Sequence, residues 1–104
     1  MKIISSLLIA IFSVSVFAGK DISRSQVDYV YQLDSDSTVF EFNSTVPHDC
    51  GGALYRVKSP NEAIANWKFS IVLTAFTADK NLAFYNTETC EDNRAIVGWV
   101  KVTK

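Results

Sequence analysis

HDCGGALYRV, residues 48–57, holds the only histidine of the chain, one of its two cysteines and a Gly-Gly pair. From Ala53 onward the stretch is rich in β-forming side chains and predicts a strand over residues 53–58. Cys50 therefore stands just before a strand, two positions after His48. Two hypotheses follow: a reactive Cys–His pair, or a structural half-cystine where a strand begins.

The first 18 residues bear on this choice. Met1-Lys2 gives a positive start, residues 3–17 are apolar apart from serines, and Ala18 closes a small-residue cleavage pattern. This order predicts a secretory signal peptide over residues 1–18 and one mature domain over residues 19–104. A membrane anchor is the alternative, but an apolar run of about 15 residues is shorter than the ~18 that a spanning helix needs. We expect a bacterial protein that is secreted or periplasmic, with no stable membrane insertion.

Export to an oxidising compartment favours a disulfide between Cys50 and Cys90. The bond would close a loop of 41 residues, which the chain-entropy treatment equates with up to about 4 kcal/mol of stability. A catalytic thiol would need a free thiolate and a base within reach, and one disulfide uses both cysteines. A single histidine and two distant cysteines also lack the paired spacing of a structural zinc site, so no metal or cofactor is expected.

The remaining pattern predicts further strands on both sides of one helix. Alternation of apolar and polar residues marks the strands, with Gly98 as a candidate bulge, and the helical period appears before Thr77. The helix start has two candidates: Pro60, with Ser59 as the N-cap, or Trp67, after Asn66. Its polar stripe is narrow and uncharged, which predicts a helix that is mostly covered. The predicted segments are strand 25–33, turn 34–37, strand 38–43, loop 43–52, strand 53–58, strand 82–86, loop 86–93 and strand 94–102.

The order β-β-β-α-β-β predicts an OB-fold-like small five-stranded barrel with one helix. The alternative is an open α+β sheet with one helix packed across it. In the barrel, the third and fifth predicted strands lie side by side and parallel, so their starts meet at one end. Cys50 and Cys90 precede these two strands, and a disulfide requires Cα atoms within about 7 Å. The cysteine positions therefore favour the barrel.

Three segments also carry a resemblance: CGGALYRV (50–57), IVLTAFTADKNLAFYNTETC (71–90) and RAIVGWVKV (94–102). They resemble small exported bacterial OB-fold-like proteins with one cysteine pair, and are similar in layout to the B subunits of subtilase-cytotoxin-like toxins. The resemblance implies an oligomeric subunit that binds cell-surface glycans. It supplies no residue that can be carried over as a sugar contact.

Charge and motifs narrow the classes of function. Nine Lys/Arg against eleven Asp/Glu in residues 19–104 leave a net charge of −2, so no nucleic acid partner is expected unless folding gathers the cations on one face. No nucleophile motif is present, which predicts a protein that is not an enzyme. The leading hypothesis is a glycan-binding subunit that acts as a homo-oligomer; the alternative is a monomeric periplasmic protein that binds or inhibits an exported protein partner. The aromatic residues expected to contact a ligand, unless they belong to the core, are Tyr29, Tyr31, Tyr55 and Trp99, with Tyr85 as a further candidate.

Overall fold

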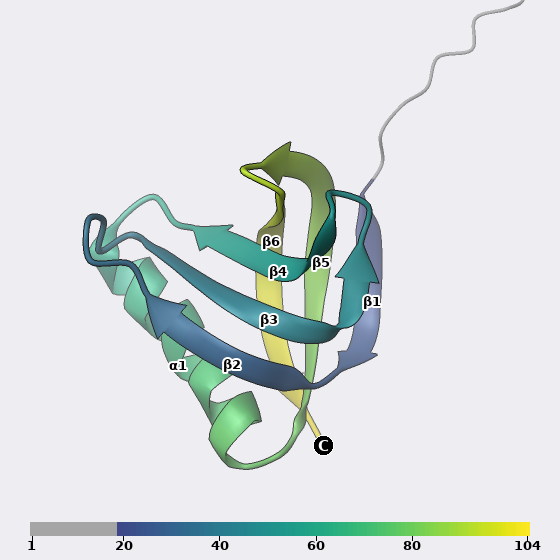
Figure 1. Cartoon of the computed structure of the whole chain (residues 1–104). Helices are drawn as coiled ribbons and strands as arrows, with labels where there is room; N and C mark the ends of the chain where they lie inside the picture. Colours follow the sequence, from purple (N-terminus) through teal and green to yellow (C-terminus); the bar gives the residue numbers. More distant parts are fainter. Residues whose placement is uncertain (1–18) are drawn as a thin grey trace, which may run out of the picture.

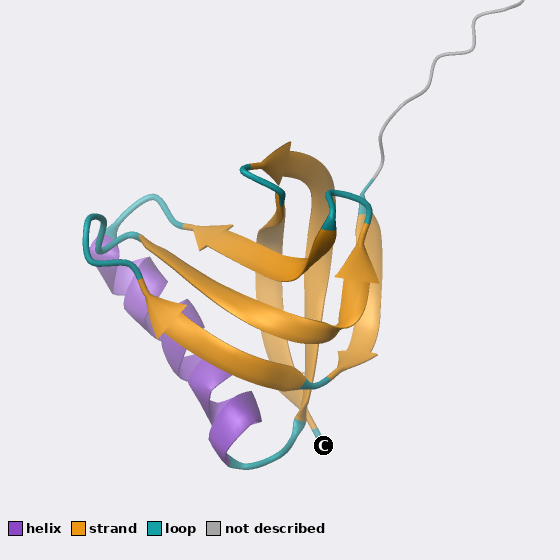
Figure 2. Cartoon of the chain, viewed as in Figure 1, coloured by secondary structure: helices purple, strands orange, loops and turns teal. Residues whose placement is uncertain are grey.

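The computed structural model of the chain describes residues 19–104; the predicted signal peptide lies outside them. These residues form one mixed six-stranded sheet and one helix, α1 (Glu62–Thr77) (Figure 1, Figure 2). The strands are β1 (Lys20–Ser25), β2 (Val27–Gln32), β3 (Val39–His48), β4 (Gly52–Lys58), β5 (Asn81–Glu91) and β6 (Arg94–Thr103).

The strand order across the sheet is β1-β5-β6-β4-β3-β2. Only β4 and β6 run parallel; every other neighbouring pair is antiparallel. The parallel pair fulfils the expectation that the third and fifth predicted strands lie side by side. The sheet is strongly curved, so that β1, β5 and β6 stand upright in Figure 1 while β2, β3 and β4 cross in front of them.

The predicted five-stranded barrel is wrong: the sheet is open, and the alternative of an α+β sheet with one helix describes it. Its two edges are β1 and β2, which follow one another in the chain with Gln26 between them. β1 pairs with β5 and β2 pairs with β3, and no ladder joins β1 to β2 among the described residues. β1 was not predicted because Ile22 is the one large apolar residue in Lys20–Ser25, which leaves no alternating pattern.

The core lies on the concave side of the sheet, beneath α1. Phe40 and Phe42 in β3 are fully buried, as their alternation predicts, and Phe40 makes an edge-on contact with Phe69 of the helix. Val72 and Ala75 bring the helix onto the same cluster. The helix is less covered than predicted, because Trp67, Leu73 and Phe76 stay exposed beside the polar stripe.

The helix begins at neither predicted position. Asn61 is the N-cap, and its side-chain oxygen accepts a hydrogen bond of 3.0 Å from the Ile64 N–H. Ser59 instead has a buried hydroxyl without a hydrogen-bond partner among the described residues. An asparagine side chain caps well from an extended backbone, and the Asn61 backbone is extended here.

Two predicted loops are strands in the structure. β3 runs through residues 43–48, where Ser44 and His48 are buried, and β5 runs through residues 87–91 as far as a two-residue turn at Asp92-Asn93. Both turn residues have positive φ angles, which suits a tight hairpin. The predicted bulge at Gly98 is confirmed, because one residue of β5, Tyr85, lies opposite two of β6, Gly98 and Trp99, between the pairs Phe84↔Val100 and Asn86↔Val97.

Candidate functional site

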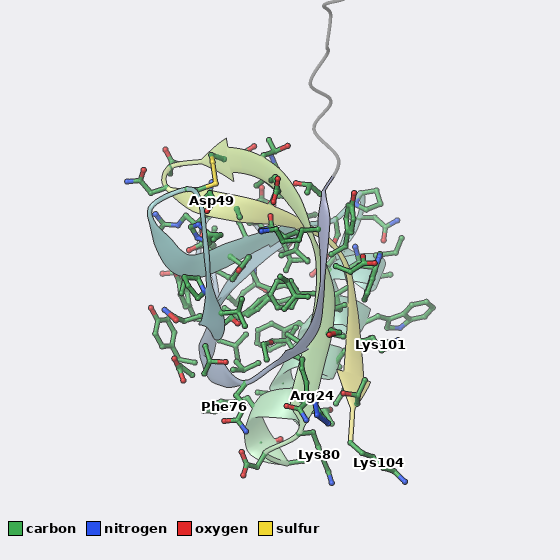
Figure 3. All side chains as sticks on the ribbon, turned by 90° about the vertical axis from the view of Figure 1, so that its right-hand side faces the viewer. Arg24, Asp49, Phe76, Lys80, Lys101 and Lys104 are labelled. Carbon is green, nitrogen blue, oxygen red and sulfur yellow. A yellow bond between two sulfur atoms is a disulfide. The ribbon has the colours of Figure 1, made fainter. Side chains whose placement is uncertain are left out.

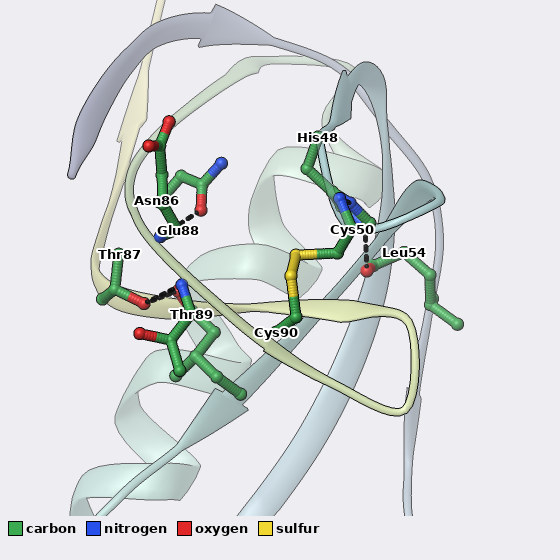
Figure 4. Close-up of a disulfide and its surroundings, with 9 residues drawn as sticks. His48, Cys50, Leu54, Asn86, Thr87, Glu88, Thr89 and Cys90 are labelled. Atoms are coloured by element: carbon green, nitrogen blue, oxygen red, sulfur yellow. Dashed lines mark hydrogen bonds between the residues drawn. A yellow bond between two sulfur atoms is a disulfide. The ribbon is translucent and has the colours of Figure 1, made fainter. Parts of the chain in front are cut away.

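The disulfide joins Cys50, in the turn between β3 and β4, to Cys90 in β5 (Figure 4), with 5.6 Å between the Cα atoms. His48 is not part of a reactive pair. Its Nδ1 accepts a hydrogen bond of 2.9 Å from the Cys50 N–H, and its Nε2 lies 2.8 Å from the Leu54 carbonyl oxygen. Since a carbonyl only accepts, Nε2 carries the proton and both ring nitrogens are satisfied by backbone groups. His48 therefore fixes the turn that presents Cys50.

Tyr55, one of the predicted ligand residues, belongs to the core. It is fully buried between Phe42 and Phe84, with ring centroids 5.5 and 4.6 Å away, and its hydroxyl donates to the Val46 carbonyl at 2.8 Å. Burial, with a smaller contribution from Asp49, raises the pKa of Tyr55 to about 12. Its ring has no surface to offer a ligand.

Tyr29 and Tyr31 lie together on the outer face of the sheet, the side away from the core. Their rings stack with centroids 6.2 Å apart, and Tyr29 is 46% exposed. Both hydroxyls already have partners: the Asn43 side chain donates to Tyr29 at 3.3 Å, and Tyr31 donates to the Glu41 carboxylate. The pair forms a small aromatic surface, and both of its hydroxyl groups already make hydrogen bonds within the fold.

Glu41 is the residue that sequence reasoning missed. Its carboxylate is buried under this outer face and accepts hydrogen bonds from Arg56 Nε at 2.7 Å and Arg94 Nε at 3.1 Å, as well as from Tyr31. Burial alone raises the pKa of Glu41, but the hydrogen bonds from Tyr31 and both arginines outweigh it and lower the pKa. The signal available was Glu41 between two inward phenylalanines, opposite Arg56 on the next strand.

The Glu41 group extends to the β5–β6 hairpin through its arginines. Arg56 Nη1 also contacts Glu91 at 3.2 Å and Asp92 at 3.3 Å, and Lys58 contacts Glu91 at 2.8 Å. Three cations thus face three carboxylates across β3, β4 and the hairpin tip. Every one of these carboxylates is engaged by a cation, so the cluster is a structural link between strands.

Tyr85 and Trp99 form a second aromatic surface, which we call the Tyr85–Trp99 platform. Tyr85 follows the core residue Phe84, so it points outward, and its ring stacks on Trp99 with centroids 6.4 Å apart and planes inclined by 21°. Trp99 is 42% exposed, and Lys101 Nζ lies 5.9 Å from the centre of its ring. Trp99 therefore does not belong to the core.

Two glycines hold the Tyr85 ring against the sheet. A Cβ atom on Gly98 would come within 3.0 Å of the Tyr85 ring, and one on Gly19 would overlap its hydroxyl and the Asn86 carbonyl oxygen. The ring therefore occupies space that side chains at both positions would fill. The platform is not recessed, because residues 19–104 form no pocket. Within the same residues, no group of three or more His, Cys, Asp and Glu side chains could hold a metal ion.

The last two observations concern membrane-spanning helices and similarity to other proteins. No helix among residues 19–104 is long and apolar enough to cross a membrane. No family model matches the chain, and no curated protein or solved structure is significantly similar to it.

Proposed function

We propose that the protein is an exported, non-catalytic binding protein that takes glycans on the Tyr85–Trp99 platform. The disulfide suits an oxidising compartment outside the cytoplasm, and with the predicted signal peptide it supports a secreted or periplasmic bacterial protein. The observation that carries the proposal is the exposed ring of Trp99 stacked on the half-buried ring of Tyr85 on the outer face of the sheet. Sugar rings present apolar C–H faces as well as hydroxyls, and aromatic side chains with polar neighbours suit both.

Tyr29 and Tyr31 are a secondary candidate for the same role. They lie on the same outer face, but β2 stands at the opposite end of the strand order from β5 and β1. The hydroxyls of this pair already bond to Asn43 and Glu41, whereas the indole N–H of Trp99 has no partner among the described residues. A buried or ligand-bound indole usually finds an acceptor for this donor. Trp99 therefore keeps a hydrogen-bond donor that a ligand could use.

A glycan array with the exported form tests the proposal. We expect binding that weakens about tenfold or more in Trp99→Ala, since losing one stacked ring and its buried area removes more than about 1.4 kcal/mol. Trp67→Ala is the matched control, because Trp67 is a more exposed tryptophan that stands on α1 and takes no part in the Tyr85–Trp99 stack. An array without any bound glycan would refute the proposal, as would equal losses in the two variants.

A protein partner is the second candidate, and the exposed face of α1 favours it. Trp67 is 72% exposed, and the only charged residue in the helix after Glu62 is Lys68, whose ammonium donates to the Gly98 carbonyl at 3.0 Å. Large exposed aromatic residues are enriched where proteins associate. Light scattering separates the candidates: a homo-oligomer that falls apart in Trp67→Ser would support a protein-binding helix, and a clean monomer that ignores the array would contradict the glycan-binding oligomer.

A further inference from the structure

Gly98 stands where both ladders of β6 are interrupted. The parallel ladder with β4 ends one residue earlier, at Val97, and the antiparallel ladder with β5 resumes only at Val100. Gly98 is also half-buried. A backbone carbonyl that is withdrawn from water without a partner costs about as much free energy as a lost hydrogen bond. The Gly98 carbonyl therefore needs a donor from outside the sheet.

Lys68 of α1 is this donor. Its ammonium donates to the Gly98 carbonyl oxygen at 3.0 Å. Lys68 follows Ala65 by three positions and precedes Val72 by four, and both of these residues are buried, so Lys68 lies on the side of the helix that faces the sheet. A lysine in such a place covers apolar surface with its stem while its ammonium reaches a polar group. The contact thus joins α1 to the bulge of β6.

The Lys68 ammonium has no competing partner of opposite charge. No carboxylate among residues 19–104 pairs with it, since the lysine ion pairs there are those of Lys20 and Lys58. A hydrogen bond from a charged donor is roughly twice as strong as one between neutral groups. The single cation of α1 therefore serves the bulge.

The bulge decides how β6 presents the Trp99 ring. Val97 and Val100 both contact the core although an odd number of positions separates them, so Trp99 falls on the outer face. Without the extra residue, strict alternation from Val97 would turn Trp99 inward and Val100 outward. The Tyr85 ring lies where a Cβ atom on Gly98 would approach it to 3.0 Å. Both rings of the platform thus depend on the backbone at Gly98.

We infer that Lys68 is a positioning residue of the Tyr85–Trp99 platform: its ammonium holds the Gly98 carbonyl and thereby keeps the Trp99 ring stacked on Tyr85. This inference rests on the proposed function. Burial of Val100 fixes the face on which Trp99 stands, and Lys68 fixes the backbone next to the ring. A ring that is ordered in advance loses less freedom when a sugar binds, so the contact raises the affinity although Lys68 touches no ligand.

The two tryptophans of the chain allow a test on Trp99 alone. In a W67F background Trp99 is the only indole, and acrylamide quenching and the anisotropy of its fluorescence report its exposure and mobility. We expect K68M to raise the quenching constant and lower the anisotropy, because methionine keeps an unbranched stem but has no ammonium. K68R should restore both values, since a guanidinium also donates. Methionine is a good helix former, so the circular dichroism of the helix should not change.

K80M is the matched control, because it makes the same substitution in an exposed lysine. Figure 3 shows Lys80 at the lower end of the molecule, below Lys101, whose ammonium lies over the Trp99 ring. K80M should leave the fluorescence of Trp99 as it is in W67F. On the glycan array, K68M should weaken binding about two- to tenfold, since that is the cost of ordering one side chain when a ligand binds. K80M should bind as the native chain does.

The outcomes separate this inference from the proposed function. Trp99 fluorescence that K68M leaves unchanged would overturn the inference, as would a change that K68R does not reverse, because the stem and not the ammonium would then be responsible. Array binding by K68M that equals native binding would also overturn it. If K68M frees the Trp99 ring and no array glycan binds the native chain, Lys68 still positions the ring and the glycan site is wrong. K68A, which removes the stem as well, replaces K68M if that variant aggregates.

Discussion

Glu41 shows how one residue can hold three strands in register. Its side chain is 1% exposed, and the two arginines that bind it are 16% and 29% exposed. We expect Glu41→Gln to lower the free energy of unfolding by about 3 kcal/mol, because it removes the buried partner of an ion pair, leaving Arg94 without a carboxylate and Arg56 with only the more exposed Glu91 and Asp92. Urea unfolding at pH 7 measures the change.

Glu91→Gln is the matched control for this substitution. Glu91 also binds a lysine and Arg56, but its side chain is 37% exposed. An ion pair that water can reach contributes about 1 kcal/mol or less, so this variant should stay close to the native stability. Equal losses in the two variants would show that burial does not distinguish Glu41.

The pH dependence of stability follows from the same carboxylate. Because its hydrogen bonds outweigh its burial, the pKa of Glu41 in the folded chain lies below its unfolded value of about 4.3. Its contribution is therefore complete above the unfolded pKa and is lost as the pH falls through the folded pKa. We expect the free energy of unfolding to fall below about pH 4.5 in the native chain and to fall less steeply in Glu41→Gln. Parallel slopes in urea titrations from pH 7 to 3 would contradict this assignment.

At the scale of elements, the start of α1 gives a prediction that separates two neighbouring residues. Asn61→Ala removes the side-chain oxygen that caps the helix, so we expect a loss of about 1 kcal/mol. Ser59→Ala removes a buried hydroxyl that has no partner among the described residues, so we expect no loss. Thermal unfolding followed by circular dichroism compares the two. A larger loss at Ser59 would place the cap where the sequence first suggested it.

The strand boundaries show what local sequence could predict. The predicted strands at 53–58 and 94–102 match β4 and β6 closely, since each segment is rich enough in β-forming residues to be recognised from its own sequence. The ends of β3 and β5 did not, because Pro47 and the run Thr87-Glu88-Thr89 resemble a loop. Their strand conformation depends on partners far away: His48 pairs with Gly52, and Cys90 pairs with Ala95.

The candidate site was predictable in part, for the same physical reason. Alternation around Phe84 places Tyr85 outward. Trp99 points outward because the bulge at Gly98 shifts the phase of β6 between the core residues Val97 and Val100. Alternation along a single strand does not say which face of a curved sheet will be covered, so it left Tyr55 undecided. The neighbours of Tyr85 on the next strand could not be predicted either, because they lie on β1, a strand with no pattern of its own, which pairs with β5.

On the scale of the whole molecule, the small size of the domain makes the disulfide a large part of its stability. The mature chain predicted here has 86 residues, and a chain of this size buries only ~60–65% of its unfolded surface. Cys50 lies before α1 and Cys90 after it, so the bond joins two parts of the sheet that are otherwise linked through the helix. These parts also meet at the β4–β6 and β1–β5 pairings and through the ion pairs of Arg56 with the hairpin.

The double variant C50A/C90A measures how much of the fold this bond sustains. We expect the free energy of unfolding to fall by about 2–4 kcal/mol, because without the bond the 41-residue loop is no longer closed in the unfolded chain. Against a total of about 5–15 kcal/mol, the remaining contacts should still give a cooperative transition at a lower urea midpoint. The helix and the Tyr85–Trp99 platform should persist, since Trp99 stacks on Tyr85, whose ring lies against Gly98, and neither contact involves the bond. A native chain that contains two free thiols, by mass spectrometry after alkylation, would refute the bond. A variant that is unfolded in water would show that the β4–β6 and β1–β5 pairings cannot join the two parts without it.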